Sequence, residues 1–134
     1  MAKIHREKII MSKYFTTKEF DCKCGCGLNN INPSFYSILD AVREELGHAL
    51  IATSGSRCLK HNAEVGGENP SEHCDGDGVD VACLDSFTRA VIIMKAIAIG
   101  VKRIGIKENS IHLGLSKKSI FPSPRIWLYP KIGG

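Results

Sequence analysis

The densest group of polar side chains in the sequence lies between Ser71 and Asp80, and it contains two residue types that bind zinc. His73 offers an imidazole nitrogen, and Asp80 offers a carboxylate oxygen seven residues later. His112 is a third candidate ligand, further along the chain. Two nitrogens and one oxygen around zinc leave a fourth position for water, which is the pattern of catalytic zinc sites. The spacing alone also fits two ordinary polar histidines, one on a loop and one on a strand.

Six cysteines are many for a chain of 134 residues, and three of them, Cys22, Cys24 and Cys26, occupy alternate positions. Cysteines two residues apart rarely pair with one another, and zinc knuckles favour the spacing C-x-x-C. The first residues contain no secretory signal, so we expect reduced and mostly buried thiols. A structural metal ion at the cysteine triplet is the alternative.

Length and charge narrow the function class. A chain of 134 residues predicts one domain, which we place at residues 14–134 after a loose N-terminal arm at residues 1–13. The net charge of +4 comes without a basic stripe that contains aromatic residues, so we do not expect a nucleic-acid partner. No apolar run reaches the roughly 20 residues of a membrane span. We therefore expect a protein made in the cytoplasm, and the pattern fixes no oligomeric state.

Capping signals and apolar spacing define the elements that must position these residues. Asn32 and Pro33 predict the start of a helix that ends at Gly47, and Asp85 predicts the start of another that ends at Gly100. We expect Trp127 to pack in the core, together with Tyr129. Short strands are expected at residues 49–53, 79–83, 102–106, 110–115 and 125–129, with a short helix from residue 18 and a helical turn near residues 61–65. Helices and strands that do not alternate as βαβ units predict an α+β fold with a small antiparallel sheet and flanking helices.

Several motifs occur in a fixed order along the chain. They are Thr53-Ser54-Gly55-Ser56-Arg57-Cys58, His61-Asn62, Val65-Gly66-Gly67 and Ser71-x-His73-x-x-Gly76-x-Gly78-x-Asp80-Val81, preceded by Tyr14-Phe15-Thr16, Glu19-Phe20 and the cysteine triplet. From about residue 14 to residue 115 the chain resembles the zinc D-alanyl-D-alanine carboxypeptidase family, and in particular its short phage-type members. The resemblance implies the small α+β fold that these D,D-peptidases share with Hedgehog signalling domains.

The resemblance also assigns roles to single residues. It implies that His73, Asp80 and His112 bind Zn²⁺, and that Arg57 receives the terminal carboxylate of a peptidoglycan peptide. A guanidinium suits a carboxylate because it can donate two parallel hydrogen bonds. Ser71 matches the family serine before the first zinc histidine, where it either binds substrate or shapes the loop.

The chain departs from the family pattern near the last ligand. Members commonly have H-V-D there, whereas this chain has His112-Leu113-Gly114 and so lacks the aspartate. Related dipeptidases place a glutamate base shortly before the last histidine. Glu108, four residues before His112, is the candidate catalytic base, and Asp77 is the second candidate.

Two functions fit these residues. The first is a zinc metallopeptidase that cleaves peptidoglycan stem peptides at a D-Ala-D-Ala-type or cross-linking bond, as a D,D-carboxypeptidase or an endopeptidase. As a phage lysis or virion-associated enzyme, such as an endolysin, it would act at the bacterial cell wall or in the periplasm. The alternative, favoured by Gly114, is a catalytically impaired, zinc-containing cell-wall-binding or structural phage module.

Overall fold

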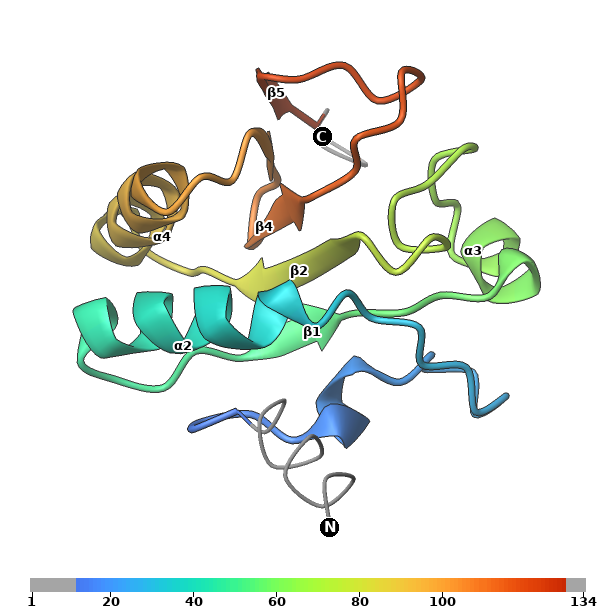
Figure 1. The fold of residues 1–134 in the computed structure, drawn as a ribbon, viewed down its shortest axis with the longest axis horizontal. Helices are drawn as coiled ribbons and strands as arrows, with labels where there is room; N and C mark the ends of the chain where they lie inside the picture. The colour runs from blue at the N-terminus through green and yellow to red at the C-terminus, as the bar shows by residue number, and fades with distance from the viewer. Residues whose placement is uncertain (1–11, 130–134) are drawn as a thin grey trace, which may run out of the picture.

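The computed structural model describes residues 12–129. Most of the predicted N-terminal arm, residues 1–11, lies outside this range. The described part contains a 3₁₀ helix, three α-helices and one five-stranded sheet, which confirms the α+β fold class (Figure 1). In chain order the elements are η1 (Thr17–Phe20), α2 (Ser34–Leu46), β1 (Ala52–Ser54), α3 (Leu59–Glu64), β2 (Gly78–Ala82), α4 (Ser86–Ala98), β3 (Arg103–Ile106), β4 (Ser110–Gly114) and β5 (Arg125–Leu128).

The two long helices begin and end close to the predicted residues. The Asn32 side chain accepts a hydrogen bond from the Ser34 N–H at the start of α2, and Gly47 ends that helix with a φ of 76°. The Asp85 carboxylate caps α4 by accepting a hydrogen bond of 2.7 Å from the Thr88 N–H. These side-chain acceptors satisfy backbone N–H groups that have no partner within the helix. No helix of residues 12–129 has the length and apolar content to cross a membrane.

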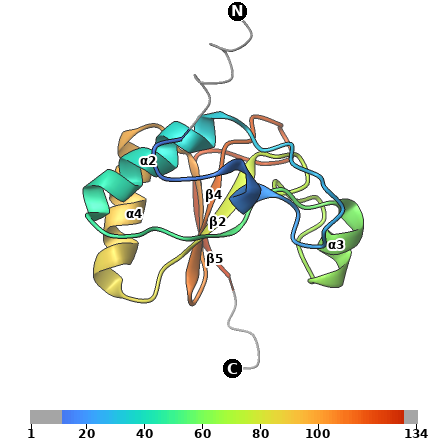
Figure 2. The same cartoon turned by 90° about the horizontal axis from the view of Figure 1, so that it is seen from below.

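The sheet separates an apolar layer from a polar one. Helices α2 and α4 cover one face, and α3 lies on the other side (Figure 2). Side chains alternate between the two faces along a strand. Val79 and Val81 of β2 are fully buried in the core beneath the two long helices, together with Ile111 and Leu113 of β4. The residues between them on each strand therefore point to the opposite face, where the candidate ligands lie.

The sheet is mixed, whereas we expected it to be antiparallel. The strands lie in the order β1-β2-β4-β3-β5, and β5 runs parallel to β3. The pairing has a simple cause, because Gly114 at the end of β4 and Arg125 at the start of β5 both align with Arg103 at the start of β3. The chain leaves β4 at that end and crosses β3 before β5 begins, so β5 must follow the direction of β3.

Candidate active site

The register of two adjacent strands brings the candidate ligands together. Asp80 on β2 lies directly opposite His112 on β4, and His73 lies on the loop that precedes β2. His112 Nδ1 is 3.0 Å from Asp80 Oδ1, and His73 Nε2 is 3.3 Å from the same oxygen. One potential ligand atom from each residue lies within 4.8 Å of the corresponding atoms of the other two, and all three side chains are buried. A single metal ion can therefore reach all three.

The remaining ring nitrogens have other partners, which fixes how the rings are oriented. His73 Nδ1 lies 2.9 Å from the Gly55 carbonyl oxygen, and His112 Nε2 lies 2.9 Å from Glu72 Oε1. The Gly55 carbonyl can only accept, so His73 Nδ1 carries a proton and Nε2 presents a lone pair to Asp80. His112 has a carboxylate oxygen beside each ring nitrogen, and a metal ion would replace the proton at Nδ1. His73 Nε2 is buried without a hydrogen-bond partner among the described residues. An unpartnered imidazole nitrogen that faces a buried carboxylate fits a cation between them.

The protonation states of His73 and Asp80 suit metal binding. Burial lowers the pKa of His73, although Asp80 opposes that shift, so the imidazole is neutral at physiological pH. Burial would raise the pKa of Asp80, but the adjacent imidazoles of His112 and His73 hold it well below its usual value. Lys107 Nζ also lies 3.0 Å from Asp80 Oδ2. A neutral imidazole and an ionised carboxylate are the forms that bind a divalent metal.

Glu72 is a site residue that the sequence analysis missed. Its side chain is buried, with Oε1 on His112 Nε2 and Oε2 accepting a hydrogen bond of 3.1 Å from the Ser116 N–H. The Arg103 Nε lies 3.0 Å from Oε2. Burial would raise the pKa of Glu72, but His112, the Ser116 N–H and Arg103 together hold it below its usual value. Glu72 is thus an ionised carboxylate that orients His112 from behind.

The position of Glu72 explains the glycine that replaces the family aspartate. A Cβ atom added to Gly114 would lie 2.3 Å from each carboxylate oxygen of Glu72. The space that a side chain at position 114 would need is therefore filled by a carboxylate from another part of the chain. The sequence does contain a sign of this exchange. An acidic residue, Glu72, precedes His73 in a chain that lacks the family aspartate at position 114.

Comparison with known families agrees with this geometry. A family model described as peptidase M15 matches residues 13–114. The chain belongs to the peptidase M15 family. Members are zinc-dependent metallopeptidases, and the resemblance to zinc D-alanyl-D-alanine carboxypeptidases is thereby confirmed. A search of curated proteins gave no match to the chain.

The candidate ligands of this M15 peptidase open onto a cleft of about 1200 Å³, lined by His73 and His112. Arg57 lies in the same cleft, half-buried, and its guanidinium donates hydrogen bonds to Asn62 Oδ1 (2.9 Å) and Ser54 Oγ (3.0 Å). These two bonds fix the guanidinium in place and leave other N–H groups for a ligand. Arg57 is therefore placed to receive an anionic group.

The other predicted site residues differ in whether they line the cleft. Ser71 lines the cleft, but its hydroxyl accepts a hydrogen bond from the His73 N–H, so it also shapes the ligand loop. Glu108 is exposed in the turn between β3 and β4 and borders the cleft. Asp77 does not line the cleft, and its carboxylate accepts a hydrogen bond from the Asn32 side chain.

The aromatic residues at the end of the described chain line the cleft, so the expectation that they lie in the core was wrong. The Trp127 ring lies 5.8 Å from the His112 ring, centroid to centroid, and 5.9 Å from the Tyr129 ring. A Cβ atom at Gly105 would lie within 3 Å of both aromatic rings. The glycine on β3 therefore leaves room for the two rings beside the candidate metal site.

Proposed function

We propose that this M15 peptidase holds Zn²⁺ with His73, Asp80 and His112 and cleaves peptidoglycan stem peptides at a D-Ala-D-Ala-type or cross-linking bond. One observation carries the proposal: three metal-binding side chains meet beside a cleft that also contains a fixed arginine. Zinc, when bound, would make a water molecule more acidic and would polarise the substrate carbonyl that this water attacks.

Four other side chains of the cleft bind the peptide or transfer the proton in the proposed reaction. Arg57 binds the terminal carboxylate of the peptide and so places the last peptide bond near the metal site. Glu108 takes the proton of the attacking water and delivers it to the leaving amine. Trp127 and Tyr129 form a wall on which the peptide lies.

The resemblance to short phage-type members extends the proposal to the place of action. The protein would act on the bacterial cell wall as a lysis or virion-associated enzyme, with a peptidoglycan peptide as its partner.

The direct experiment is to incubate the zinc-loaded protein with purified pentapeptide muropeptides and with cross-linked dimers. Release of free D-alanine from pentapeptides supports a carboxypeptidase, whereas conversion of dimers to monomers supports an endopeptidase. The same sample treated with a chelator is the control. Retained zinc without turnover of any substrate contradicts the enzyme and supports the cell-wall-binding module.

Arg57→Lys is expected to weaken the binding of carboxylate-terminated peptides. Lysine keeps the positive charge but cannot donate two parallel hydrogen bonds, and it cannot replace the contacts to Asn62 and Ser54 in the same geometry. We expect KM for pentapeptide to rise about 10-fold or more, since hydrogen bonds between charged groups contribute about 1.5–3 kcal/mol. An amidated pentapeptide is the control substrate, and an equal loss on both substrates would contradict the assignment.

Glu108→Gln is expected to keep the zinc content and to lower kcat by about 100- to 10,000-fold, the usual contribution of a general base. The substitution preserves the size of the side chain and removes its ability to hold a proton. Glu68→Gln, which changes an exposed carboxylate on another loop of the cleft, is the matched control and should retain activity. Full activity in Glu108→Gln would place the base elsewhere.

A further inference from the structure

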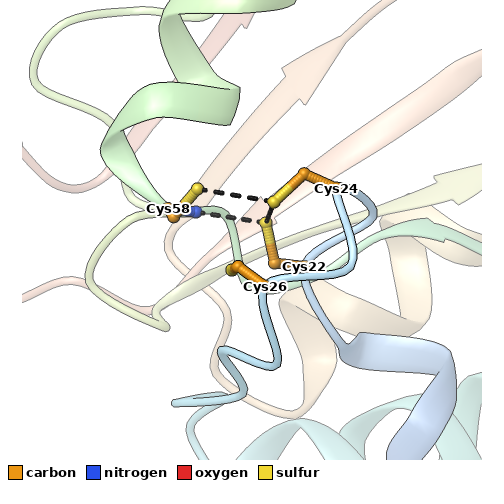
Figure 3. A group of neighbouring side chains, drawn as sticks. All are labelled: Cys22, Cys24, Cys26 and Cys58. Carbon is orange, nitrogen blue, oxygen red and sulfur yellow. Dashed lines mark hydrogen bonds between the residues drawn. The ribbon is translucent and has the colours of Figure 1, made fainter.

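Four cysteines gather at a second location. Three of them lie on the loop between η1 and α2, and the fourth, Cys58, is the residue that precedes α3 (Figure 3). Cys22 is buried and Cys58 is half-buried, whereas Cys24 and Cys26 are exposed, so the expectation of mostly buried thiols was wrong for the triplet. The four sulfur atoms all lie within 4.8 Å of one another. Residues 36 positions apart thus meet at one point.

The distances between the sulfur atoms fit a single tetrahedral ion. Cys22 Sγ lies 3.5 Å from Cys24 Sγ, which in turn lies 3.7 Å from Cys58 Sγ. A zinc ion with four sulfur ligands at about 2.3 Å has sulfur–sulfur separations of about 3.8 Å. All four cysteines are free thiols. Soft thiolates in tetrahedral geometry select zinc among the metals without redox chemistry.

The backbone of the loop is shaped for this convergence. Along an extended chain, alternate residues are about 7 Å apart, so the first and third cysteines of the triplet would be far too distant to share an ion. Gly25 and Gly27 have φ values of 87° and 88°, a left-handed conformation that other residues adopt at a cost. The Gly25 N–H donates to the Cys22 carbonyl oxygen, and the Cys22 N–H donates to the Leu28 carbonyl oxygen. The loop therefore folds back on itself and brings its three thiols close together.

Backbone donors also point at two of the sulfur atoms. The Cys58 N–H lies 3.4 Å from Cys22 Sγ, and the His61 N–H lies 3.3 Å from Cys58 Sγ. Donors of this kind stabilise negative charge on ligand atoms and orient them, as the outer contacts of metal sites do.

We propose that Cys22, Cys24, Cys26 and Cys58 bind a second Zn²⁺, a structural ion that fixes the cysteine loop to the segment that carries Arg57. Four protein ligands fill the tetrahedron and leave no position for water, which is typical of structural and not of catalytic zinc. The ion replaces the four thiol protons, which are released to solvent, and no oxidation is involved. The same segment is already tied to its surroundings by hydrogen bonds from the Ser56 N–H to the Phe20 carbonyl and from the Arg57 N–H to the His73 carbonyl.

Metal analysis of the full-length protein, purified under reducing conditions, tests this proposal. We expect two zinc ions per chain in the wild type, one in the double variant Cys24→Ser/Cys58→Ser and one in His73→Ala. Cys83→Ala removes a thiol from the hydrophobic core and is the matched control, with two ions expected. The proposal does not rest on the peptidase activity, because the two single-site losses are counted separately.

Cobalt substitution keeps the test decisive if a variant is poorly folded. Cobalt bound by thiolates has intense charge-transfer absorption in the near ultraviolet, which a site of two histidines and one aspartate lacks. We expect this absorption in the wild type and in His73→Ala, and its loss in Cys24→Ser/Cys58→Ser. A wild type with one zinc ion and no thiolate–cobalt absorption would overturn the second site, as would iron in place of zinc or a disulfide found by thiol titration.

Discussion

His73→Ala is expected to remove the zinc ion of the histidine–aspartate site and to lower kcat/KM on muropeptides by at least about 1000-fold. The substitution takes away one of three protein ligands and leaves Asp80 and His112 with an incomplete coordination sphere. Zinc content and D-alanine release are measured on the same preparation. His48→Ala changes an exposed histidine outside the cleft and is the matched control, with both quantities unchanged.

Asp80→Asn provides a second variant for the same site. Asparagine preserves the shape of this buried side chain, so we expect the fold to be retained. It removes the negative charge that faces both imidazoles, so we expect the metal affinity to fall. Circular dichroism checks that each variant is folded. Full zinc content and full activity in both variants would mean that the metal and the reaction lie elsewhere in the molecule.

The elements that carry these ligands were largely predictable, because their signals are local. Asp85 and Gly100 bracket one long helix, and both act within a few residues of their own position. The alternation of apolar and polar residues on β2 and β4 likewise places Asp80 and His112 on the face opposite the core. The family resemblance identified these residues as ligands, and the pairing register of β2 and β4 explains why Asp80 and His112 lie side by side.

Contacts between distant parts of the chain could not be predicted in this way. Glu72 meets His112 across 40 residues and the Ser116 N–H across 44, and no spacing rule relates them. Cys58 joins the cysteine triplet only because the segment before α3 packs against the loop after η1. The parallel pairing of β5 depends on the path of residues 115–124, which have no periodic pattern. Each of these three contacts depends on tertiary packing and has no local sequence signal.

The exchange of a carboxylate between positions 72 and 114 leads to a prediction about pairs of substitutions. Gly114→Asp alone is expected to destabilise the protein by at least about 3 kcal/mol. Its side chain would overlap the carboxylate of Glu72 and would bury a second negative charge beside it. Gly114 has no positive φ, so the backbone itself accepts aspartate. Thermal or urea unfolding of the zinc-loaded protein measures the loss.

Glu72→Ala alone is expected to lower zinc affinity or activity by about 10- to 100-fold, the usual effect of removing the acceptor behind a metal-binding histidine. It also leaves the buried Arg103 side chain without its carboxylate, which costs about 3–5 kcal/mol of stability. These are the effects expected of a residue that positions His112.

The double variant Glu72→Ala/Gly114→Asp is expected to recover most of both losses. Removing Glu72 vacates the space that the new aspartate needs, and the aspartate returns a carboxylate to the neighbourhood of His112 and Arg103. The two substitutions therefore compensate one another, and the double-mutant cycle has a favourable coupling energy. Losses that simply add in the double variant would show that Glu72 and position 114 act independently. In that case the carboxylate of Glu72 would stabilise only the strand ends and would not stand in for the family aspartate.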